Sequence, residues 1–271
     1  MGTIEHTART RHGHFFVLEN DSYISRSLLA YGEWTEDETE LLAQVLRPGD
    51  TVIDAGANIG ALTVPFARAV GPAGSVCAFE PQPGIFRLLA ANTVINGLAN
   101  VRLFHAACGA EAGELLLDEH DFAAPANYGA LSLEHLSSGT AALRRSVPVL
   151  TLDAAFQGDA LRLIKIDVEG AETSVLRGAA ALIARFRPAL YVENEFPERS
   201  PELLAAVQSL GYDAYWHLAR LFRPDNFRGE AENIFGDIVC VNMICFPAEH
   251  DVPVVGLAKV SGLTGHPRKG G

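Results

Sequence analysis

The sequence is short of basic residues and has no long apolar run, and each shortage excludes a class of protein. Its 21 Lys and Arg stand against 33 Asp and Glu, which gives a formal net charge of −12. Binding to nucleic acid depends on clustered basic side chains, so this charge argues against a nucleic-acid partner. Residues 1–14 lack the apolar core of a secretory signal, and no stretch reaches the length of a membrane span. We therefore expect a cytoplasmic protein without a membrane partner.

Only four cysteines occur, and their positions match neither a metal-ligand spacing nor a secreted disulfide framework. They are expected to be free thiols. The 271 residues, 48% of them hydrophobic, suffice for one sizeable core. We predict a main domain over 51–247 and a strand and helix extension over 1–50 that packs on it. Residues 248–271 are rich in Gly, Pro and charge, and they predict a flexible C-terminal tail.

A strand, a glycine turn and a helix start occur within ten residues, Thr51–Gly60. The strand is short and apolar, as a parallel strand buried on both faces requires, and Asp54 lies at its end. Glycine permits the close approach and positive φ of a tight turn, and asparagine tolerates a left-handed conformation. Ligands of open α/β sheets bind at the carboxyl ends of the strands, so we predict a cofactor site here. The turn residues of this site are Gly56, Ala57, Asn58 and Gly60.

The chemistry of the turn favours S-adenosylmethionine over a dinucleotide. The spacing is not G-x-G-x-x-G, and the carboxylate of Asp54 would repel a pyrophosphate. S-adenosylmethionine has no phosphate and carries a positive charge. Glu80 ends the next predicted strand, where a carboxylate accepts hydrogen bonds from both ribose hydroxyls. Either acid alone could simply cap a turn, but the pair at this spacing favours the cofactor.

Three motifs in this order resemble the FkbM family of methyltransferases: Asp54–Gly60, Phe79–Pro81 and Ile166–Glu172. The resemblance extends from about Tyr31 to about Pro247. It implies an α/β, Rossmann-like class I methyltransferase fold, with a mostly parallel seven-stranded sheet, helices on both faces and an antiparallel last strand. It also implies S-adenosylmethionine as cofactor and acceptors that are mostly hydroxyls of sugars, polyketides and related secondary metabolites, with carboxylates in some members.

The resemblance adds two residues to the predicted cofactor site. Pro81 follows Glu80 within the second motif. The third predicted strand, 101–107, ends at Ala107, and in methyltransferase folds the adenine lies beyond this strand. We therefore expect Pro81 and Ala107 to contact the cofactor.

Carboxylates end two further predicted strands on the same edge as Asp54. Asp167 ends strand 161–167 and is followed by Glu169, and Glu193 lies near the end of strand 189–195. By strand alternation Glu193 shares a face with Glu195. Such carboxylates could remove a proton from an acceptor hydroxyl, hold the methionine amino group or bind a divalent metal. We take Asp167 as the first choice of base, with Glu169 or Glu193 next, and include Asp167 among the cofactor contacts; magnesium is possible but is not predicted.

Four residues are candidate substrate contacts, namely Tyr31, Asn127, Asn194 and Trp216. Tyr31 begins an aromatic and acidic cluster that could fold over the cofactor or act only as a hydrophobic staple. Asn127 lies in the aperiodic connection 118–146, and connections of that length are usually functional or disordered. Thr35 and Glu38 have the spacing of a capping box at the start of a helix.

The leading hypothesis is an O-methyltransferase for a small hydroxylated molecule such as a sugar. The alternatives are a carboxyl or N-methyltransferase, an NAD-dependent oxidoreductase, and a non-catalytic cofactor-binding partner subunit. The absent G-x-G-x-x-G and Tyr-x-x-x-Lys patterns oppose the oxidoreductase. The acids at the strand ends oppose the non-catalytic subunit. A homo-oligomer is possible.

Overall fold

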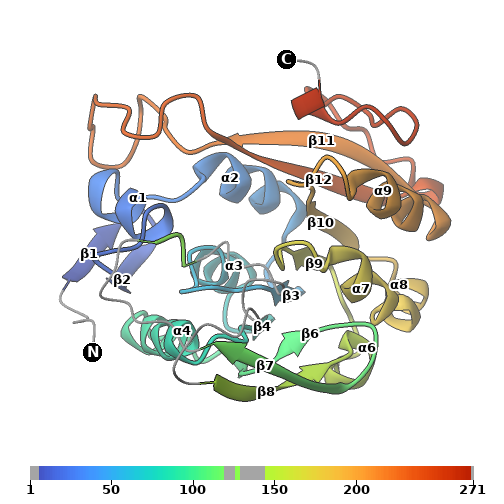
Figure 1. Cartoon of the computed structure of the whole chain (residues 1–271), viewed down its shortest axis with the longest axis horizontal. Helices are drawn as coiled ribbons and strands as arrows, with labels where there is room; N and C mark the ends of the chain where they lie inside the picture. Colours follow the sequence, from blue (N-terminus) through green and yellow to red (C-terminus); the bar gives the residue numbers. More distant parts are fainter. Residues whose placement is uncertain (1–5, 119–125, 129–143, 270–271) are drawn as a thin grey trace.

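The computed structural model describes residues 6–118, 126–128 and 144–269. Seven strands form the central sheet in the order β11-β12-β10-β9-β3-β4-β5 (Figure 1). Strands β5, β4, β3, β9 and β10 are parallel, and β12 is antiparallel to both β10 and β11. This confirms the predicted fold class. The bounds are β3 Thr51–Ala55, β4 Ser75–Phe79, β5 Val101–Phe104, β9 Leu163–Ile166, β10 Ala189–Glu193, β11 Tyr212–Arg220 and β12 Val239–Pro247.

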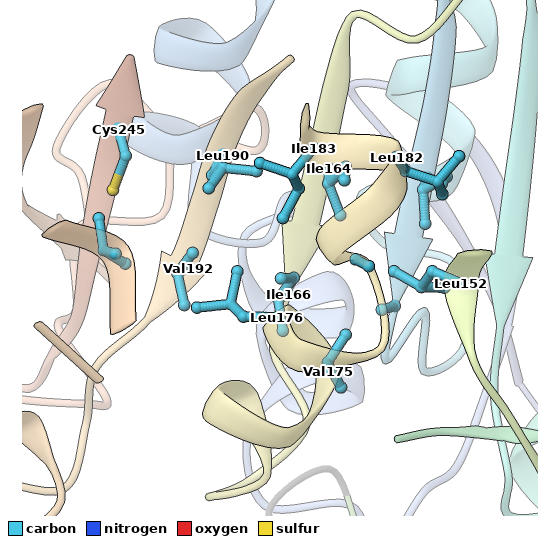
Figure 2. Packing of buried hydrophobic residues seen from close by; sticks show 14 of the residues in the cluster. Leu152, Ile164, Ile166, Val175, Leu176, Leu182, Ile183, Leu190, Val192 and Cys245 are labelled. Atoms are coloured by element: carbon cyan, nitrogen blue, oxygen red, sulfur yellow. The ribbon is translucent and has the colours of Figure 1, made fainter. Parts of the chain in front are cut away.

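Helices cover both faces of this sheet because neighbouring strand residues point to opposite sides. Val52 packs toward α2 and α3, whereas Ile53 belongs to the cluster beneath α7, α8 and α9. Figure 2 shows the second cluster, in which Ile166 and Val192 of the sheet face Leu176 of α7. No helix among the described residues is both long enough and apolar enough to cross a bilayer. The helices are α1 Ile24–Ala30, α2 Glu36–Val45, α3 Thr63–Val70, α4 Pro83–Ile95, α6 Leu152–Ala155, α7 Glu172–Arg177, α8 Ala180–Phe186 and α9 Ser200–Ser209.

The N-terminal extension forms a hairpin, β1 His6–Thr10 and β2 Gly13–Val17, followed by α1 and α2. The hairpin packs on α4, where Asn92 accepts a hydrogen bond from Phe16 N at 2.6 Å and its amide donates to Phe16 O at 3.1 Å. The sequence predicts one strand and the second helix; β1 and α1 were not predicted. The hairpin contacts fix the position of the extension beside the cofactor turn, since the Asn92 amide also donates to Ile59 O at 2.8 Å.

The third predicted strand divides between two sheets. Residues 101–104 form edge strand β5, and β6 Ala107–Cys108 leaves the central sheet to pair with β8 Arg144–Leu150. Strand β7 Gly113–Asp118 completes a three-stranded sheet in the order β6-β8-β7. Of the aperiodic connection predicted between 118 and 146, residues 119–125 and 129–143 lie outside the described part of the chain.

The C-terminal segment 248–269 packs against the sheet, which corrects the prediction of a flexible tail. Trp216 N donates to Ala258 O at 2.9 Å, and Val260 N donates to Ala214 O at 2.8 Å, so the segment satisfies polar groups along β11. His266 is buried and contacts Asn194 O through Nε2 at 2.7 Å. Composition could not reveal this packing because the partners are backbone groups of a sheet edge. We call residues 251–269 the C-terminal strap.

Candidate cofactor and acceptor site

A cavity of about 450 Å³ lies at the carboxyl ends of β3, β4, β9 and β10. This is the edge where parallel α/β sheets bind ligands. Segments from the N-terminal extension and from the region after β11 close its other side. The cavity brings together ten of the predicted site residues: Gly56, Ala57, Asn58, Glu80, Pro81, Ala107, Asn127, Asp167, Glu169 and Glu193.

The glycine turn is held against the end of β4. Gly56 N and Ala57 N both donate to Phe79 O, at 3.0 and 2.9 Å. Gly56 has φ +82°, and a Cβ there would lie 1.7 Å from Asp167 O, so no larger residue fits. Asn58 has φ +50° and its Oδ1 accepts from Ile59 N at 2.7 Å. The turn therefore presents close backbone to the cavity, as predicted from its glycine and asparagine.

Glu80 is held in place by the same turn. Its Oε2 accepts from Asn58 N at 3.1 Å and its Oε1 from Gln82 N at 2.8 Å, and the side chain is buried. Burial raises the pKa of Glu80 to about 7, although the two backbone N–H groups oppose the shift. A fixed carboxylate at this position can receive the hydroxyls of a ribose, and Ala107 lies on the same cavity wall.

Asp54 does not line the cavity but lies beneath it. It is fully buried; its Oδ2 accepts from Thr63 Oγ1 at 2.6 Å, and its Oδ1 lies 3.3 Å from Lys165 Nζ. Gly60 also lies outside the cavity lining, where its φ of +92° shapes the exit of the turn. These two residues thus lie outside the cavity wall and contact the residues of the turn, and their contact with the cofactor stays a prediction.

Lys165 is the functional residue that sequence reasoning missed on β9. Its Nζ donates to Gly56 O at 2.7 Å and lies 3.3 Å from both Asp54 Oδ1 and Asp167 Oδ2. Burial lowers the pKa of Lys165, but the charges of Asp167 and Asp54 outweigh burial and raise it overall. The available signal was a lysine in the otherwise apolar strand Leu163–Ile166, paired with Asp54 across the sheet.

Asp167, Glu169 and Glu193 form what we call the carboxylate cluster. One oxygen from each lies within 4.8 Å of the others, which makes the cluster able to hold a metal ion or a shared proton. Burial, followed by the charge of Asp167, raises the pKa of Glu169 to about 9 and raises that of Glu193 well above its ordinary value. Strand alternation is confirmed here, since Glu193 and Glu195 line the cavity and Asn194 does not.

Glu38 is a second missed residue, and it lines the cavity from α2. Thr35 adopts φ +36° and its side chain makes no cap, so the predicted capping box is wrong. Glu38 instead accepts a hydrogen bond from Asn242 Nδ2 at 3.1 Å. Burial, and then the charge of Asp167, raises the pKa of Glu38 to about 8. Its partner lies 204 residues away in the sequence, so no local pattern could reveal the contact.

Aromatic and aliphatic side chains complete the wall beside Glu38. They come from the N-terminal extension and from the segment that joins β11 to β12. They are Tyr23, Ile24, Trp34, Leu221 and Ile238. We call these side chains and the carboxylate cluster the acceptor half of the cavity, and the turn, Glu80, Pro81 and residues 106–108 the cofactor half, after the roles that we propose for them below.

Three of the four predicted substrate contacts lie outside the cavity. Tyr31 is buried, and its hydroxyl donates to Glu232 O at 3.0 Å and accepts from Ile234 N at 2.8 Å. Asn194 donates to Ser200 Oγ at 3.0 Å. Trp216 packs edge-on against the strap's His266, with ring centroids 5.5 Å apart. Of the four residues only Asn127 lines the cavity, and substrate contact by the other three stays a prediction that their position does not support.

The chain has relatives among characterised proteins. Over 68 residues it is 47% identical to the 31-O-demethyl-FK506 methyltransferase FkbM of Streptomyces tacrolimicus, with 25% of each chain covered. Over 150 residues it is 29% identical to Methyltransferase 1 of Beauveria bassiana, with 48% of this chain and 59% of that relative covered. The chain therefore spans less than two thirds of the length of either relative.

Solved structures give a weaker likeness. The methyltransferase FkbM of Methylobacillus flagellatus KT is 18% identical with a TM-score of 0.46, covering 76% of this chain and 50% of that one. The precorrin-6y C5,15-methyltransferase of Geobacter metallireducens GS-15 is 12% identical with a TM-score of 0.48, covering 78% and 87%.

The family assignment rests on the longest match. Residues 54–214, more than half of the 271-residue chain, match the Methyltransferase FkbM domain. The match includes the cofactor turn, Glu80 and the carboxylate cluster, and it confirms the resemblance found in the sequence. The chain belongs to the FkbM family of S-adenosylmethionine-dependent methyltransferases.

Proposed function

We propose that this chain transfers the methyl group of S-adenosylmethionine to a hydroxyl of a small molecule. The observation that carries the proposal is the position of the carboxylate cluster, which shares one cavity with the cofactor turn and Glu80. A hydroxyl acceptor needs a group that takes its proton, and the cluster offers three. The S. tacrolimicus relative, whose name describes methylation at an oxygen, supports the same reaction.

The residues of the chain fit this cofactor. Glu80 suits the ribose hydroxyls, and the Gly56 turn allows the methionine portion to approach the backbone. Asp167 Oδ2 lies 3.3 Å from Lys165 Nζ and its side chain lines the cavity, so we assign it the methionine amino group in addition to its role near the acceptor. When bound, S-adenosylmethionine supplies a methyl group that is already strongly electrophilic. The protein then has to align the acceptor oxygen and remove its proton.

Glu169 and Glu193 are poor proton acceptors near neutral pH. The pKa of Glu169 is raised to about 9 and that of Glu193 well above its ordinary value, so each acid tends to keep its own proton and suits hydrogen bonding to the acceptor. The acceptor oxygen would form its bond to the methyl carbon as the carbon–sulfur bond breaks. The hydroxyl proton would pass to Asp167, and S-adenosylhomocysteine would leave as a neutral thioether. Asp167 therefore stays our first choice of base.

The acidic lining of the cavity favours a neutral acceptor. A carboxylate acceptor would lie among Glu38, Glu195 and the carboxylate cluster, and the two basic residues of the lining, Lys165 and Arg268, already have acidic partners. A sugar or another polyol can hydrogen-bond to these acids and place its C–H face on Trp34 or Tyr23. We therefore favour a neutral, hydroxylated secondary metabolite or sugar as the acceptor. We also propose a cytoplasmic location for the protein.

The test is a transfer assay with methyl-deuterated S-adenosylmethionine and a panel of sugars and polyols, each beside its amine and carboxylate analogue. A mass increase on hydroxyl compounds alone is the expected result. Methyl esters formed on the carboxylate analogues would contradict the proposal. Binding of NAD in place of S-adenosylhomocysteine in calorimetric titrations would overturn the cofactor assignment as well.

A further inference from the structure

The carboxylate cluster brings three acidic side chains together beside few basic ones. Among the described residues that line the cavity, Lys165 and Arg268 are the only lysine and arginine. Lys165 already lies 3.3 Å from Asp54 and donates a hydrogen bond to Gly56 O. Arg268 of the strap forms its ion pair with Glu195. Glu169 and Glu193 therefore have no basic side chain of their own.

Glu193 gives a second and independent sign of a missing partner. Its Oε2 has less than 1 Å² of solvent-accessible surface, and no group in the described part of the chain hydrogen-bonds to it. A buried carboxylate oxygen without a hydrogen-bond donor is costly unless a cation or a proton compensates it. This oxygen belongs to a side chain that lies within reach of the other two members of the cluster.

We propose that Asp167, Glu169 and Glu193 bind one divalent cation of the Mg²⁺ or Mn²⁺ type. The three ligand oxygens lie within 4.8 Å of one another. Oxygens bound at about 2.1 Å to octahedral Mg²⁺ lie about 3 Å apart when adjacent and about 4.2 Å apart when opposite, so the three side chains would draw together around the ion. A ligand set made only of carboxylates selects such hard cations over Zn²⁺, which prefers nitrogen and sulfur.

The cation deepens the proposed function, on which this role rests. An acceptor hydroxyl that coordinates the ion has a lowered pKa, so its proton leaves more readily than from the free alcohol. The positive charge also compensates Glu169 and Glu193, the two acids that Lys165 does not contact. The cation thus prepares the acceptor oxygen in the same place where the methyl group arrives.

Titration of the full chain with Mn²⁺ alone tests the site without any acceptor. The protein is first treated with EDTA, and free Mn²⁺ is followed by electron paramagnetic resonance. We expect one Mn²⁺ per chain. Glu169→Gln and Glu193→Gln should each weaken binding by about tenfold or more. Glu198→Gln, which changes an exposed acid outside the cavity, should leave it unchanged. No binding at millimolar Mn²⁺, or equal binding by all variants, overturns the proposal.

Thermal unfolding separates metal ligation from a structural role. Glu193→Gln keeps the size of the side chain and removes only its acidity, so without metal this variant should have a Tm at least as high as that of the wild type while it loses affinity for Mn²⁺. A fall in both quantities would instead make Glu193 structural and would overturn its assignment as a ligand.

The proposed function fails separately from the metal site. Specific Mn²⁺ binding without methylation of any hydroxyl compound would retain the site and overturn the proposed function. Methylation of a hydroxyl compound that persists in EDTA, together with an absence of Mn²⁺ binding, would retain the function and overturn the site.

Discussion

The two halves of the cavity are built in different ways. The cofactor half comes from one part of the chain, residues 56–108: the turn after β3 donates backbone N–H groups to Phe79 O at the end of β4 and to the carboxylate of Glu80, the next residue along the chain. The acceptor half joins residues from opposite ends of the sequence, such as Glu38 of α2 and Asn242 of β12. A family can therefore keep the first half as a motif while the second half changes with the acceptor.

We expect the largest loss of stability and of cofactor binding from a substitution at Gly56, where the backbone of the turn lies closest to its neighbours. Gly56→Ala places a Cβ 1.7 Å from Asp167 O, which the backbone can avoid only by moving the turn. We expect a loss of about 3 kcal/mol in the free energy of unfolding and no measurable binding of S-adenosylhomocysteine. Gly71→Ala is the matched control, because Gly71 also has a positive φ but no atom within 4 Å of its added Cβ. Denaturant unfolding should show a loss of only about 1 kcal/mol for this control.

Glu80→Ala should come next. It removes a carboxylate assigned to the ribose and also frees Asn58 N and Gln82 N, which Glu80 now accepts from. Loss of charge-assisted hydrogen bonds of about 1.5–3 kcal/mol each predicts that the Kd for S-adenosylhomocysteine rises by roughly 100-fold. Calorimetric titration measures this change. An unchanged Kd would remove Glu80 from the cofactor half.

Glu38, in the acceptor half, makes the stability of the folded protein depend on pH. Its folded-state pKa of about 8 lies above the value of about 4.5 for an unfolded glutamate, so the folded state holds a proton that the unfolded state releases. The contribution of Glu38 to the free energy of unfolding is therefore greatest at low pH and falls as the pH rises between about 5 and 8. Glu38→Gln should reduce that fall by at least about 1 kcal/mol, measured by urea unfolding at both pH values in EDTA. An identical pH profile in the variant would contradict the shifted pKa.

The smallest expected effect is on the KM for the acceptor, and it should differ between variants of the two tryptophans. Trp34 lines the acceptor half, whereas Trp216 contacts the strap outside the cavity. Trp34→Phe should raise the KM for the acceptor by about threefold and leave the affinity for S-adenosylhomocysteine unchanged, since it trims one aromatic wall. Trp216→Phe should change neither quantity. An equal change in KM for both variants would show that the strap, rather than the wall, controls the acceptor half.

The same contrast explains how much of the molecule the sequence could predict. The core strands along the chain, the turn at Gly56 and the acids at the strand ends follow from local patterns, namely apolar runs, glycine spacing and strand alternation, whereas the seven-stranded sheet followed from the family resemblance. Lys165 was missed because a lone lysine in a strand has no periodic signal, although its neighbour Asp54 was identified. Its meaning arises only when β9 pairs with β3.

Local sequence patterns could not predict the acceptor half or the packing of the strap, and the reason is physical. Glu38 fits a capping box by spacing, but Thr35 adopts a left-handed conformation and Asn242 captures the carboxylate instead. The strap is rich in glycine, but its backbone groups form hydrogen bonds with β11 and His266 is buried beside Asn194. In both cases the decisive partner is distant in the sequence, and tertiary contacts override the local preference.

Calorimetric titration with S-adenosylhomocysteine tests the division of the cavity most directly, with the wild type, Glu80→Ala and Glu193→Gln measured side by side in EDTA. The account predicts binding by the wild type in the micromolar range, a large loss in Glu80→Ala and a change of less than about threefold in Glu193→Gln. Equal losses in the two variants, or an absence of binding by the wild type, would contradict a cofactor half that is separate from the acceptor half.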